Sequence, residues 1–434
     1  MRVLVIGSGA REHALTARLD ADRDVGELLV APGNPGIARL ARTVSVDIGD
    51  RDAVLALADR EQIDLTVVGP ELPLSRGIAD RFASEGRLLF GPTAAAARLE
   101  SSKAFAKAFM TRHDVPTARF HTCDSLDEAL ASVRTDEFGL PVVLKADGLA
   151  AGKGVVIAED RATAERAVVE AMRDRKFGAA GDRIVIEECL RGPEVSFFLV
   201  CDGARAVPIG TAQDHKRVFD EDRGPNTGGM GAFAPSPLVD PALEARIMRE
   251  IVEPVIAGMA AEGHPFRGFL YAGLVLTASG PKVIEFNVRL GDPEAQVVLP
   301  LIDEPLLPLL VAGATGALSC TSVSLGAECF TGVVLASRGY PESSESDQPI
   351  TGIDRAEGIP GVAVYHAGTS RRGGQLVTAG GRVLTVVGRG DDFAEAIARA
   401  YAGVFQISFN GMQYRHDIGR KALKSETRNQ KSEV

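Results

Sequence analysis

Short apolar runs alternate with helical patterns at the start of the chain, and this alternation constrains the fold more than any other feature. Runs typical of buried strands stand at 3–6, 28–31 and 65–68, with helical spacing at 12–19 and 52–60 between them. Strand, helix and strand in this order form right-handed crossovers and a parallel sheet, whose ligand-binding loops follow the carboxyl ends of the strands. We therefore predict a Rossmann-like substrate-binding domain over residues 1–101.

The middle of the chain predicts a larger domain over residues 102–325. Two β-rich pieces flank a helix and predict an inserted lid subdomain at about 123–190. The segment 213–237 has little periodicity and many Gly, Pro, Asn and charged residues, and so long a loop in a compact domain is usually functional. A helix at 241–262 and strands at 269–277 and 282–288 follow it.

The last part of the chain predicts a small α+β domain over residues 326–421, because short strands and turns precede one helix at 391–404. Residues 422–434 are polar, and we expect them to form a flexible tail. The predicted fold class is therefore α/β and α+β multidomain, with a parallel N-terminal sheet, a central domain that carries a lid, and a small C-terminal domain.

Composition excludes several classes of function. The chain has 58 acidic and 48 basic residues, and a net charge of −10 offers no general attraction to nucleic acid or to an anionic membrane. Its five cysteines form no CxxC pair and have no ligand-like spacing with the seven histidines, so we interpret them as reduced packing residues. No signal segment or membrane-length apolar stretch is found, and a cytoplasmic location is expected.

A glycine turn, Gly7-Ser8-Gly9, follows the first predicted strand and opens the first helix. Its backbone N–H groups can hold a phosphate at the helix N-terminus. The NAD fingerprint has a third glycine where Glu12 stands, and it requires an acid after the second strand, where 31–34 has none. A substrate phosphate is favoured over NAD, with a merely tight turn as the alternative.

A second glycine-rich segment runs from Lys145 to Gly154 between two predicted strands. It is not a P-loop, because Gly148 and Gly152 are four residues apart rather than five and a strand follows. A hairpin loop of this kind can still close over a polyphosphate, with its amides as donors and Lys153 as a point charge. A plain glycine-rich hairpin is the alternative.

A third motif is the apolar strand that ends in Glu187 and Glu188, followed seven residues after Glu187 by Glu194. Backbone groups at such a strand end can recognise the edge of an adenine, and Glu194 can accept hydrogen bonds from ribose hydroxyls. Solvated carboxylates at a strand end are the alternative.

The segment 283–289 predicts a metal site. Strand alternation places Glu285, Asn287 and Arg289 on one face, and the apolar residues at 284, 286 and 288 anchor the other. Mg²⁺ prefers oxygen ligands and usually binds one or two protein groups together with substrate phosphates, which suits Glu285 and Asn287. The turn 291–294 then begins a helix whose N-terminus faces the same edge.

Taken in order, these segments resemble the ATP-grasp enzymes, and among them the phosphoribosylamine–glycine ligase (glycinamide ribonucleotide synthetase) family. The resemblance spans nearly the whole chain, and the stretches 213–217 (QDHKR) and 224–232 (GPNTGGMGA) are far more specific than a glycine loop. It implies an ATP-grasp core and a cytoplasmic purine-biosynthesis ligase that joins glycine to 5-phosphoribosylamine, using ATP with Mg²⁺ or Mn²⁺. A monomer or weak oligomer without nucleic-acid or membrane partners is expected.

The resemblance also implies a role for each matching residue. Lys103 and Lys145 would meet the ATP phosphates under the loop of Gly148, Gly152, Lys153 and Gly154, while Glu187, Glu188, Cys189 and Leu190 would frame adenine and Glu194 the ribose. Glu285 and Asn287 would bind the metal. Asp214 and Arg289 would hold glycine and act in catalysis with Lys216. Phosphoribosylamine would meet Gly9, Arg11, Glu12, Pro70, Glu71 and Asp292.

Departures from the family pattern are mild. Ser8 and Ala10 stand where relatives often have Asn and Gly, and Val288 and Leu290 replace the more usual Cys and Phe. The strand 269–277 contains no acid that could supply a further metal ligand, which leaves the number of metal ions open. Another ATP-grasp carboxylate–amine ligase and a catalytically idle nucleotide-binding regulator are the competing functions.

Overall fold

The structure of the chain is a computed structural model that describes residues 1–149 and 154–423. The predicted loop residues Gly152 and Lys153 lie outside the described residues, as does the predicted tail from 424 onward. Ala422 is fully buried in a cluster with Phe233 and Phe393, so the start of the predicted tail was placed too early.

The N-terminal region is a five-stranded parallel sheet in the order β3-β2-β1-β4-β5, as the alternating pattern predicts. β1 lies at its centre because its apolar residues are buried on both faces, between β2 and β4. The elements are β1 (Arg2–Gly7), α1 (Ala10–Asp20), β2 (Glu27–Pro32), β3 (Arg42–Thr43), α2 (Arg51–Arg60), β4 (Leu65–Val68), α3 (Glu71–Ser75), α4 (Ile78–Ser84) and β5 (Leu89–Phe90).

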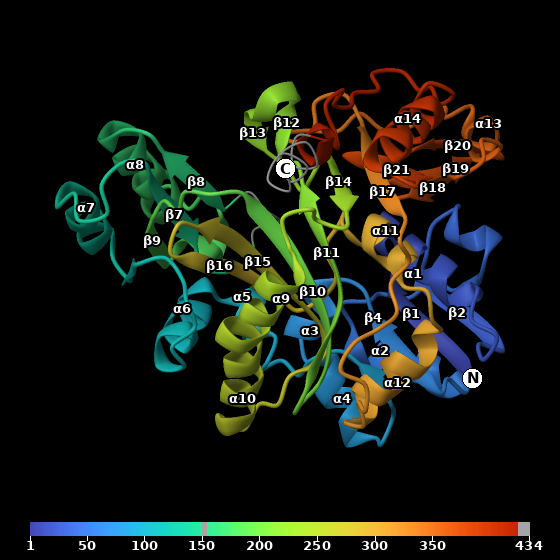
Figure 1. Cartoon of the computed structure of the whole chain (residues 1–434), viewed down its shortest axis with the longest axis horizontal. Coiled ribbons are helices and arrows are strands. Elements are labelled where there is room, and N and C mark those ends of the chain that lie inside the picture. The colour runs from blue at the N-terminus through green and yellow to red at the C-terminus, as the bar shows by residue number, and fades with distance from the viewer. Residues whose placement is uncertain (150–153, 424–434) are drawn as a thin grey trace, which may run out of the picture.

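Two helices lead to a lobe that projects from the body at the left of Figure 1. This lid contains a four-stranded sheet in the order β6-β9-β7-β8, and its described residues pack in a hydrophobic cluster of their own. The elements are α5 (Arg98–Ser101), α6 (Lys103–Arg112), β6 (Phe120–Cys123), α7 (Leu126–Arg134), β7 (Val142–Ala146), β8 (Val155–Ala158), α8 (Arg161–Val168) with a π-helical turn at Val169–Arg173, and β9 (Ile184–Glu188).

An eight-stranded sheet forms the body, in the order β16-β15-β10-β11-β14-β17-β21-β18. Its first five strands come from the central part of the chain and its last three from the C-terminal part, so both share one sheet. The central elements are β10 (Glu194–Asp202), β11 (Ala206–Asp214), β12 (Arg217–Phe219), β13 (Arg223–Asn226), β14 (Gly231–Ala234), α9 (Pro241–Ile247), α10 (Glu253–Ala261), β15 (Arg267–Thr277), β16 (Gly280–Asn287), α11 (Ala295–Val298) and α12 (Leu306–Thr315).

In the C-terminal part, α14 packs on β17 and β21. This part of the chain lies beside the N-terminal region, where β18 contacts α1 (Figure 1). Its elements are β17 (Cys329–Ala336), α13 (Ile353–Glu357), β18 (Val362–His366), β19 (Thr369–Arg372), β20 (Gln375–Thr378), β21 (Arg382–Gly390) and α14 (Phe393–Val404). One hydrophobic cluster joins Val30 of the first sheet, Phe198 of the body and Val387 of the C-terminal part.

The segment 213–237 is not a plain loop, which corrects the sequence prediction. It holds the end of β11, the β12–β13 hairpin and β14, and β14 links β11 to β17. Strands of three or four residues are too short to show a readable alternation, so the sequence pattern gave no sign of them.

Candidate active site

The predicted metal strand is β16, and its polar face is largely as expected. Glu285 pairs with Gly273 and Asn287 with Tyr271 of β15, while Phe286 and Val288 are buried. The expected burial of Ile284 is wrong. A β-bulge opposite Gly273 and Leu274 leaves Ile284 outside the register and partly exposed. Its carbonyl accepts a hydrogen bond from the Lys145 Nζ at 2.8 Å, so the bulge ties this strand to the lid.

Glu285 lies in a strongly cationic environment. Burial alone would raise the pKa of its carboxyl, but Lys216, Lys145, Lys103 and Arg289 together hold that pKa below its usual value. The carboxylate is therefore ionised at neutral pH, although several of these cations also pair with other acids, as Lys145 does with Glu187 and Lys216 with Glu194. Such a set suits an anionic ligand that brings a divalent cation with it.

Lys145 and Lys107 share the carboxylate of Glu187 at the junction between lid and body. Lys145 Nζ lies 3.1 Å from one carboxylate oxygen and Lys107 Nζ 2.9 Å from the other. Desolvation lowers the pKa of Lys107 to about 8, although Glu187 opposes that shift. The side chain of Glu187 thus holds two lysines in place.

Glu188 is also used structurally, since its carboxylate accepts from the backbone N–H and the Nε of Arg119, each at 3.0 Å. Its own N–H donates to the Arg119 carbonyl at 3.0 Å. Of the four residues predicted to frame adenine, Cys189 and Leu190 come after the end of β9. Their backbone groups therefore do not take part in the pairing of β9 with β6.

The start of the predicted phosphate loop is fastened to the start of α6. Lys103 Nζ donates to the Gly148 carbonyl at 3.0 Å, and the Ala104 N–H donates to Asp147 at 3.1 Å. Gly148 has a φ of +142°, and a Cβ there would lie 2.9 Å from the Cβ of Ala180. At the far end of the loop, the Gly154 carbonyl accepts from the Ala146 N–H at 2.8 Å. The two ends of the loop are thereby placed beside Lys103 and Lys145.

Asp214 and Lys216 end β11 and begin the next turn, beside Glu194 of β10. Lys216 Nζ lies 2.6 Å from the Glu194 carboxylate, so the predicted ribose acceptor is engaged in an ion pair. Burial, with Glu194 and Glu285 nearby, raises the pKa of Asp214. Burial opposes the charge of Lys216, but Glu194 and Asp214 outweigh it and raise the pKa of Lys216 well above its usual value.

Arg289 bridges the metal strand and the N-terminal region. Its Nη2 lies 2.7 Å from Glu100, its Nε 3.3 Å from Glu71, and its Nη1 donates to the Leu290 carbonyl at 3.2 Å. Glu100 also accepts from the Val288 N–H at 2.8 Å. Sequence reasoning missed Glu100 because its partners are almost two hundred positions away along the chain.

The predicted phosphate site at the start of α1 is filled by the protein itself. The Gly9 N–H donates to Glu12 at 2.6 Å, and Arg11 Nε donates to the other oxygen of the same carboxylate at 2.6 Å. A Cβ on Gly69 would lie 2.2 Å from that oxygen, so glycine is required for the carboxylate to fit. The turn thus presents an acid and its Gly9 N–H is already bonded, while the contact of a substrate phosphate with this turn stays a prediction.

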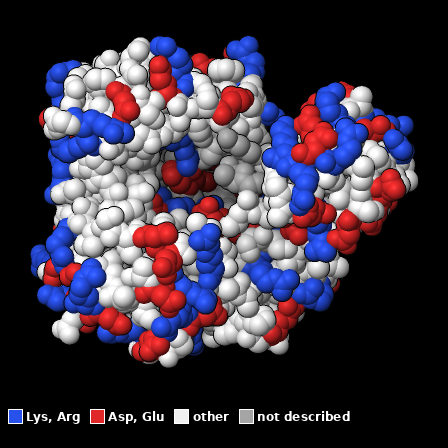
Figure 2. Space-filling view, turned by 180° about the vertical axis from the view of Figure 1, so that it is seen from behind, with Lys and Arg blue, Asp and Glu red and all other residues white. Residues whose placement is uncertain are grey.

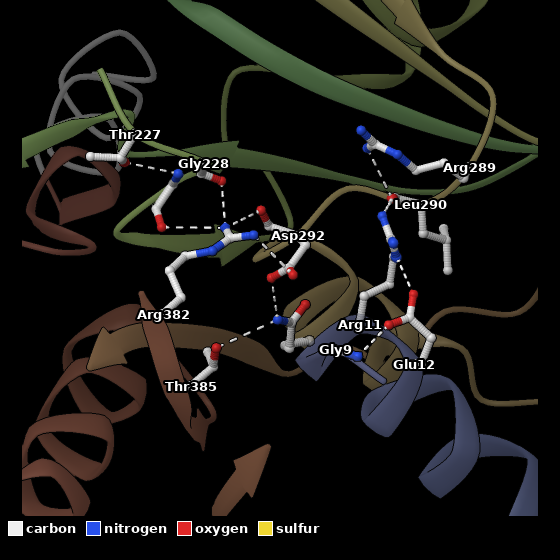
Figure 3. A network of polar contacts seen from close by, with 12 residues as sticks. Gly9, Arg11, Glu12, Thr227, Gly228, Arg289, Leu290, Asp292, Arg382 and Thr385 are labelled. Carbon is white, nitrogen blue, oxygen red and sulfur yellow. Dashed lines mark hydrogen bonds and ion pairs between the residues drawn. The ribbon is translucent and has the colours of Figure 1, made fainter. Parts of the chain in front are cut away.

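Asp292 is held by the C-terminal part of the chain, as Figure 3 shows. Its carboxylate lies 3.0 Å from Arg382 Nη2 and accepts from Gln296 at 2.8 Å. Two residues from it along the chain, Glu294 is buried, and the hydroxyl of Ser196 donates to it at 3.4 Å. Sequence reasoning missed Arg382 and Ser196 because no motif marks them, and it placed Glu294 in the turn 291–294 without giving it a role.

Part of the predicted site is therefore brought together. The structure brings Glu285, Arg289, Lys103, Lys145, Asp214 and Lys216 into one electrostatic group. Figure 2 shows a hollow in the body in which acidic and basic side chains lie close together. Within 1–149 and 154–423, no group of three or more His, Cys, Asp or Glu could hold a metal by itself.

Comparisons with known proteins identify the family to which the chain belongs. Residues 1–100, 101–295 and 330–421 match the N domain, the ATP-grasp (A) domain and the C domain of phosphoribosylglycinamide synthetase. A phosphoribosylamine–glycine ligase from Xanthomonas campestris pv. campestris is 51% identical over 98% of this chain and 99% of its own length. The chain belongs to the phosphoribosylamine–glycine ligase family.

Solved structures agree with this family. A phosphoribosylamine–glycine ligase from Thermotoga maritima superposes with a TM-score of 0.84 at 33% identity, covering 96% of this chain and 100% of that one. A biotin carboxylase from Campylobacter jejuni has a TM-score of 0.71 at 18% identity, covering 95% of this chain and 93% of its own, which shows a shared fold alone. A member of the phosphoribosylamine–glycine ligase family is an ATP-grasp ligase, so the predicted fold and enzyme class are confirmed. Among the described residues, no helix is long and apolar enough to span a membrane.

Proposed function

We propose that this chain joins glycine to 5-phosphoribosylamine at the expense of ATP, giving glycinamide ribonucleotide, ADP and phosphate. The observation that carries the proposal is the half-buried, ionised Glu285 among Lys103, Lys145, Lys216 and Arg289. A carboxylate beside four cationic side chains suits the phosphates of a nucleotide together with a small acid. The family and the curated relatives support this choice of substrates.

Glycine's carboxylate is a poor electrophile, so transfer of the γ-phosphoryl group must first turn one of its oxygens into a leaving group. In the proposed mechanism Lys103 and Lys145 neutralise the transferring group, and the closed lid keeps water from the glycyl phosphate. Glu285 and Asn287 would hold Mg²⁺ or Mn²⁺, which when bound offsets phosphate charge. The protein supplies position and charge, and no nucleophilic side chain is required.

The remaining residues would hold the two acceptor substrates. We assign the carboxylate of glycine to Arg289, whose orientation Glu100 and Glu71 fix, and its ammonium group to Asp214, with Lys216 beside it. Phosphoribosylamine is assigned to the residues Gly9, Arg11, Glu12, Pro70, Glu71 and Asp292. Adenine is assigned to Cys189 and Leu190. Cytoplasmic location and a monomeric or weakly associated state remain predictions.

Release of ADP, measured with purified protein, tests the proposal. Release should require glycine and phosphoribosylamine together, and mass spectrometry should identify glycinamide ribonucleotide as the product. Release that depends on another acid or amine would instead assign the chain to another carboxylate–amine ligase activity. ATP binding without ADP release under any pair of substrates would indicate a regulator.

A further inference from the structure

Arg382 is the first residue of β21, yet its side chain reaches out of the C-terminal part into the candidate active site (Figure 3). Its Nη1 donates to the carbonyls of Gly228 and Asp292, the latter at 2.6 Å, and its Nη2 lies 3.0 Å from the Asp292 carboxylate. Its side chain is 21% exposed. One guanidinium therefore joins two loops that are distant in sequence, and charge-assisted bonds of this kind are among the stronger polar contacts.

The first of these loops is the turn Gly228–Gly229, which is held from two sides. The hydroxyl of Tyr340 accepts from the Gly228 N–H at 2.9 Å, and Arg382 binds the carbonyl of the same residue. Gly229 has a φ of +110°, and a Cβ there would lie 2.4 Å from Pro293 Cδ. The turn thus packs directly on the loop that carries Asp292, and only glycine fits.

This turn also touches the catalytic candidates. Both the N–H and the hydroxyl of Thr227 donate to the Lys216 carbonyl at 2.8 Å. A displacement of the Gly228–Gly229 turn would therefore be passed directly to the backbone of Lys216.

The second loop faces the start of α1. An added Cβ on Gly9 would lie 3.7 Å from the Asp292 carboxylate, so this acid stands next to the proposed phosphoribosylamine surface. Gln296 connects it further to β21, since its Nε2 lies 2.8 Å from Asp292 and 3.5 Å from the Thr385 hydroxyl. Arg382 also offsets the negative charge of Asp292 through their ion pair at 3.0 Å.

We propose that Arg382 is a positioning residue, through which the C-terminal part holds the Gly228–Gly229 turn and Asp292 in one geometry for the phosphorylated sugar amine. The inference rests on the proposed function, because it assigns the sugar amine to the surface between Gly9 and Asp292. Lys103, Lys145 and the lid are held by other contacts, so ATP binding should not depend on Arg382.

Steady-state kinetics of Arg382→Met, with each substrate varied in turn, test the inference. Loss of these charge-assisted bonds should raise the KM for phosphoribosylamine about tenfold while the KM for ATP changes less than about twofold. Arg382→Lys should recover part of the loss, because it keeps the charge without the planar fork. Asp292→Asn should likewise raise the KM for phosphoribosylamine more than the KM for ATP. In the double variant, the rise in the KM for phosphoribosylamine should be smaller than the product of the two single-variant rises.

Arg389→Met is the matched control, because Arg389 lies on the same strand with a 54% exposed side chain paired to Glu328. It should leave all three KM values unchanged. Equal increases in the KM for ATP and for phosphoribosylamine, or the same profile in both arginine variants, would overturn the inference.

Hydrogen exchange of the free protein separates this inference from the proposed function. Arg382→Met should increase exchange in peptides covering 227–231 and 290–294, and Arg389→Met should not. Unchanged exchange in those peptides would refute the positioning role whatever reaction the enzyme performs. If the native protein released no ADP with glycine and phosphoribosylamine, the proposed function would fail, while the exchange result would still decide whether Arg382 positions these loops.

Discussion

At the scale of single residues, the charge of Glu285 depends on side chains that no local pattern connects to it. Lys103 comes from the start of α6, Lys145 from the lid and Lys216 from the turn after β11. Each is predicted by itself from a short motif, but their convergence on one carboxylate is a property of the fold. A half-buried acid kept ionised in this way is ready to bind a cation without first losing a proton.

Glu285→Gln tests the role of that carboxylate. The amide is nearly isosteric and leaves Phe286 and Val288 packed, so the variant should still fold, with a midpoint of thermal unfolding lowered slightly because the neighbouring cations lose an ionised partner. Loss of one charge-stabilising group should lower kcat about a hundredfold, on the order of 3 kcal/mol in the transition state. Glu328→Gln, at a carboxylate that is 41% exposed, should have normal kcat. Near-normal turnover of Glu285→Gln at limiting Mg²⁺ would remove Glu285 from the metal site.

Glu294 gives a prediction for pH. Burial, together with the neighbouring Asp214, raises the pKa of this carboxyl from 4.5 to about 7. Between these two pH values the folded protein keeps a proton on Glu294 that the unfolded chain has lost. The stability that the protonated Glu294 contributes is therefore complete below pH 4.5 and is lost as the pH rises through about 7. Its slope is about 1.4 kcal/mol per pH unit for one proton.

Glu294→Gln removes that dependence. In urea unfolding with chelator and without nucleotide, the free energy of unfolding of the variant relative to the native protein should rise between pH 5 and pH 7 and level off above. Glu342→Gln, at an exposed position, should give a difference in the free energy of unfolding that does not change with pH. A flat difference for Glu294→Gln as well would show that Glu294 is ionised in the folded protein throughout this range.

The sequence predicted the polar face of β16 correctly, because period-two alternation depends only on neighbouring residues. It did not predict the bulge at Ile284, which is set by pairing with β15, or the contacts of Arg382, which lies 90 positions from Asp292. The glycine turn at Gly9 was interpreted as a phosphate site and Glu12 as a substrate contact, but the hydrogen bond from the Gly9 N–H to the Glu12 carboxylate could not be read from the sequence.

At the scale of elements, a short C-terminal segment holds the β12–β13 hairpin in place. Arg415 is 1% exposed and lies 2.9 Å from Asp222, 2.7 Å from Asp417 and 3.0 Å from the Arg217 carbonyl. The Glu221 N–H donates to Asp417 at 2.9 Å. The hairpin overlaps the end of the stretch 213–217 and the start of 224–232, so its anchorage affects both Lys216 and the Gly228–Gly229 turn.

Arg415→Met should therefore destabilise the protein by about 3 kcal/mol, because it leaves the partners of a buried charge uncompensated. Urea unfolding measures the loss, and hydrogen exchange should rise most in peptides covering 217–226. Arg420→Met, an exposed position in the same segment, should change neither quantity. A loss of stability without faster exchange in the hairpin would mean that Arg415 supports another part of the molecule.

The long regular elements were predictable from sequence, while this hairpin and β14 were not. An amphipathic helix such as α14 repeats its pattern over twelve residues. β12 has three residues and β14 four, and what makes them strands is the partner beside each. Composition alone marked 213–237 as functional, which agrees with the position of its residues beside the cleft.

At the scale of the whole molecule, the lid and the C-terminal part are attached in different ways. The lid has its own sheet and its own hydrophobic cluster. The C-terminal strands instead continue the body sheet through β14 and β17, and Phe330, Tyr365 and Val387 belong to a cluster with residues of β1 and β10. The sequence indicated three regions but not this continuity, because strand order within a sheet depends on contacts between distant segments.

This difference predicts opposite results for two deletions. Phe120 and Glu187 are register partners, so a short Gly-Ser link from Arg119 to Glu188 can replace the lid without stretching the body. Lys107 would lose Glu187, and changing it to Met avoids a buried unpaired charge. The lid-deleted chain should unfold cooperatively in urea, monitored by circular dichroism, but release no ADP because Lys145 and the phosphate loop are gone.

A chain that ends at residue 325 should not fold, because it exposes β14 as an edge and opens a shared core. Cooperative unfolding of that shorter chain would show that the C-terminal strands are an appendage rather than part of the body.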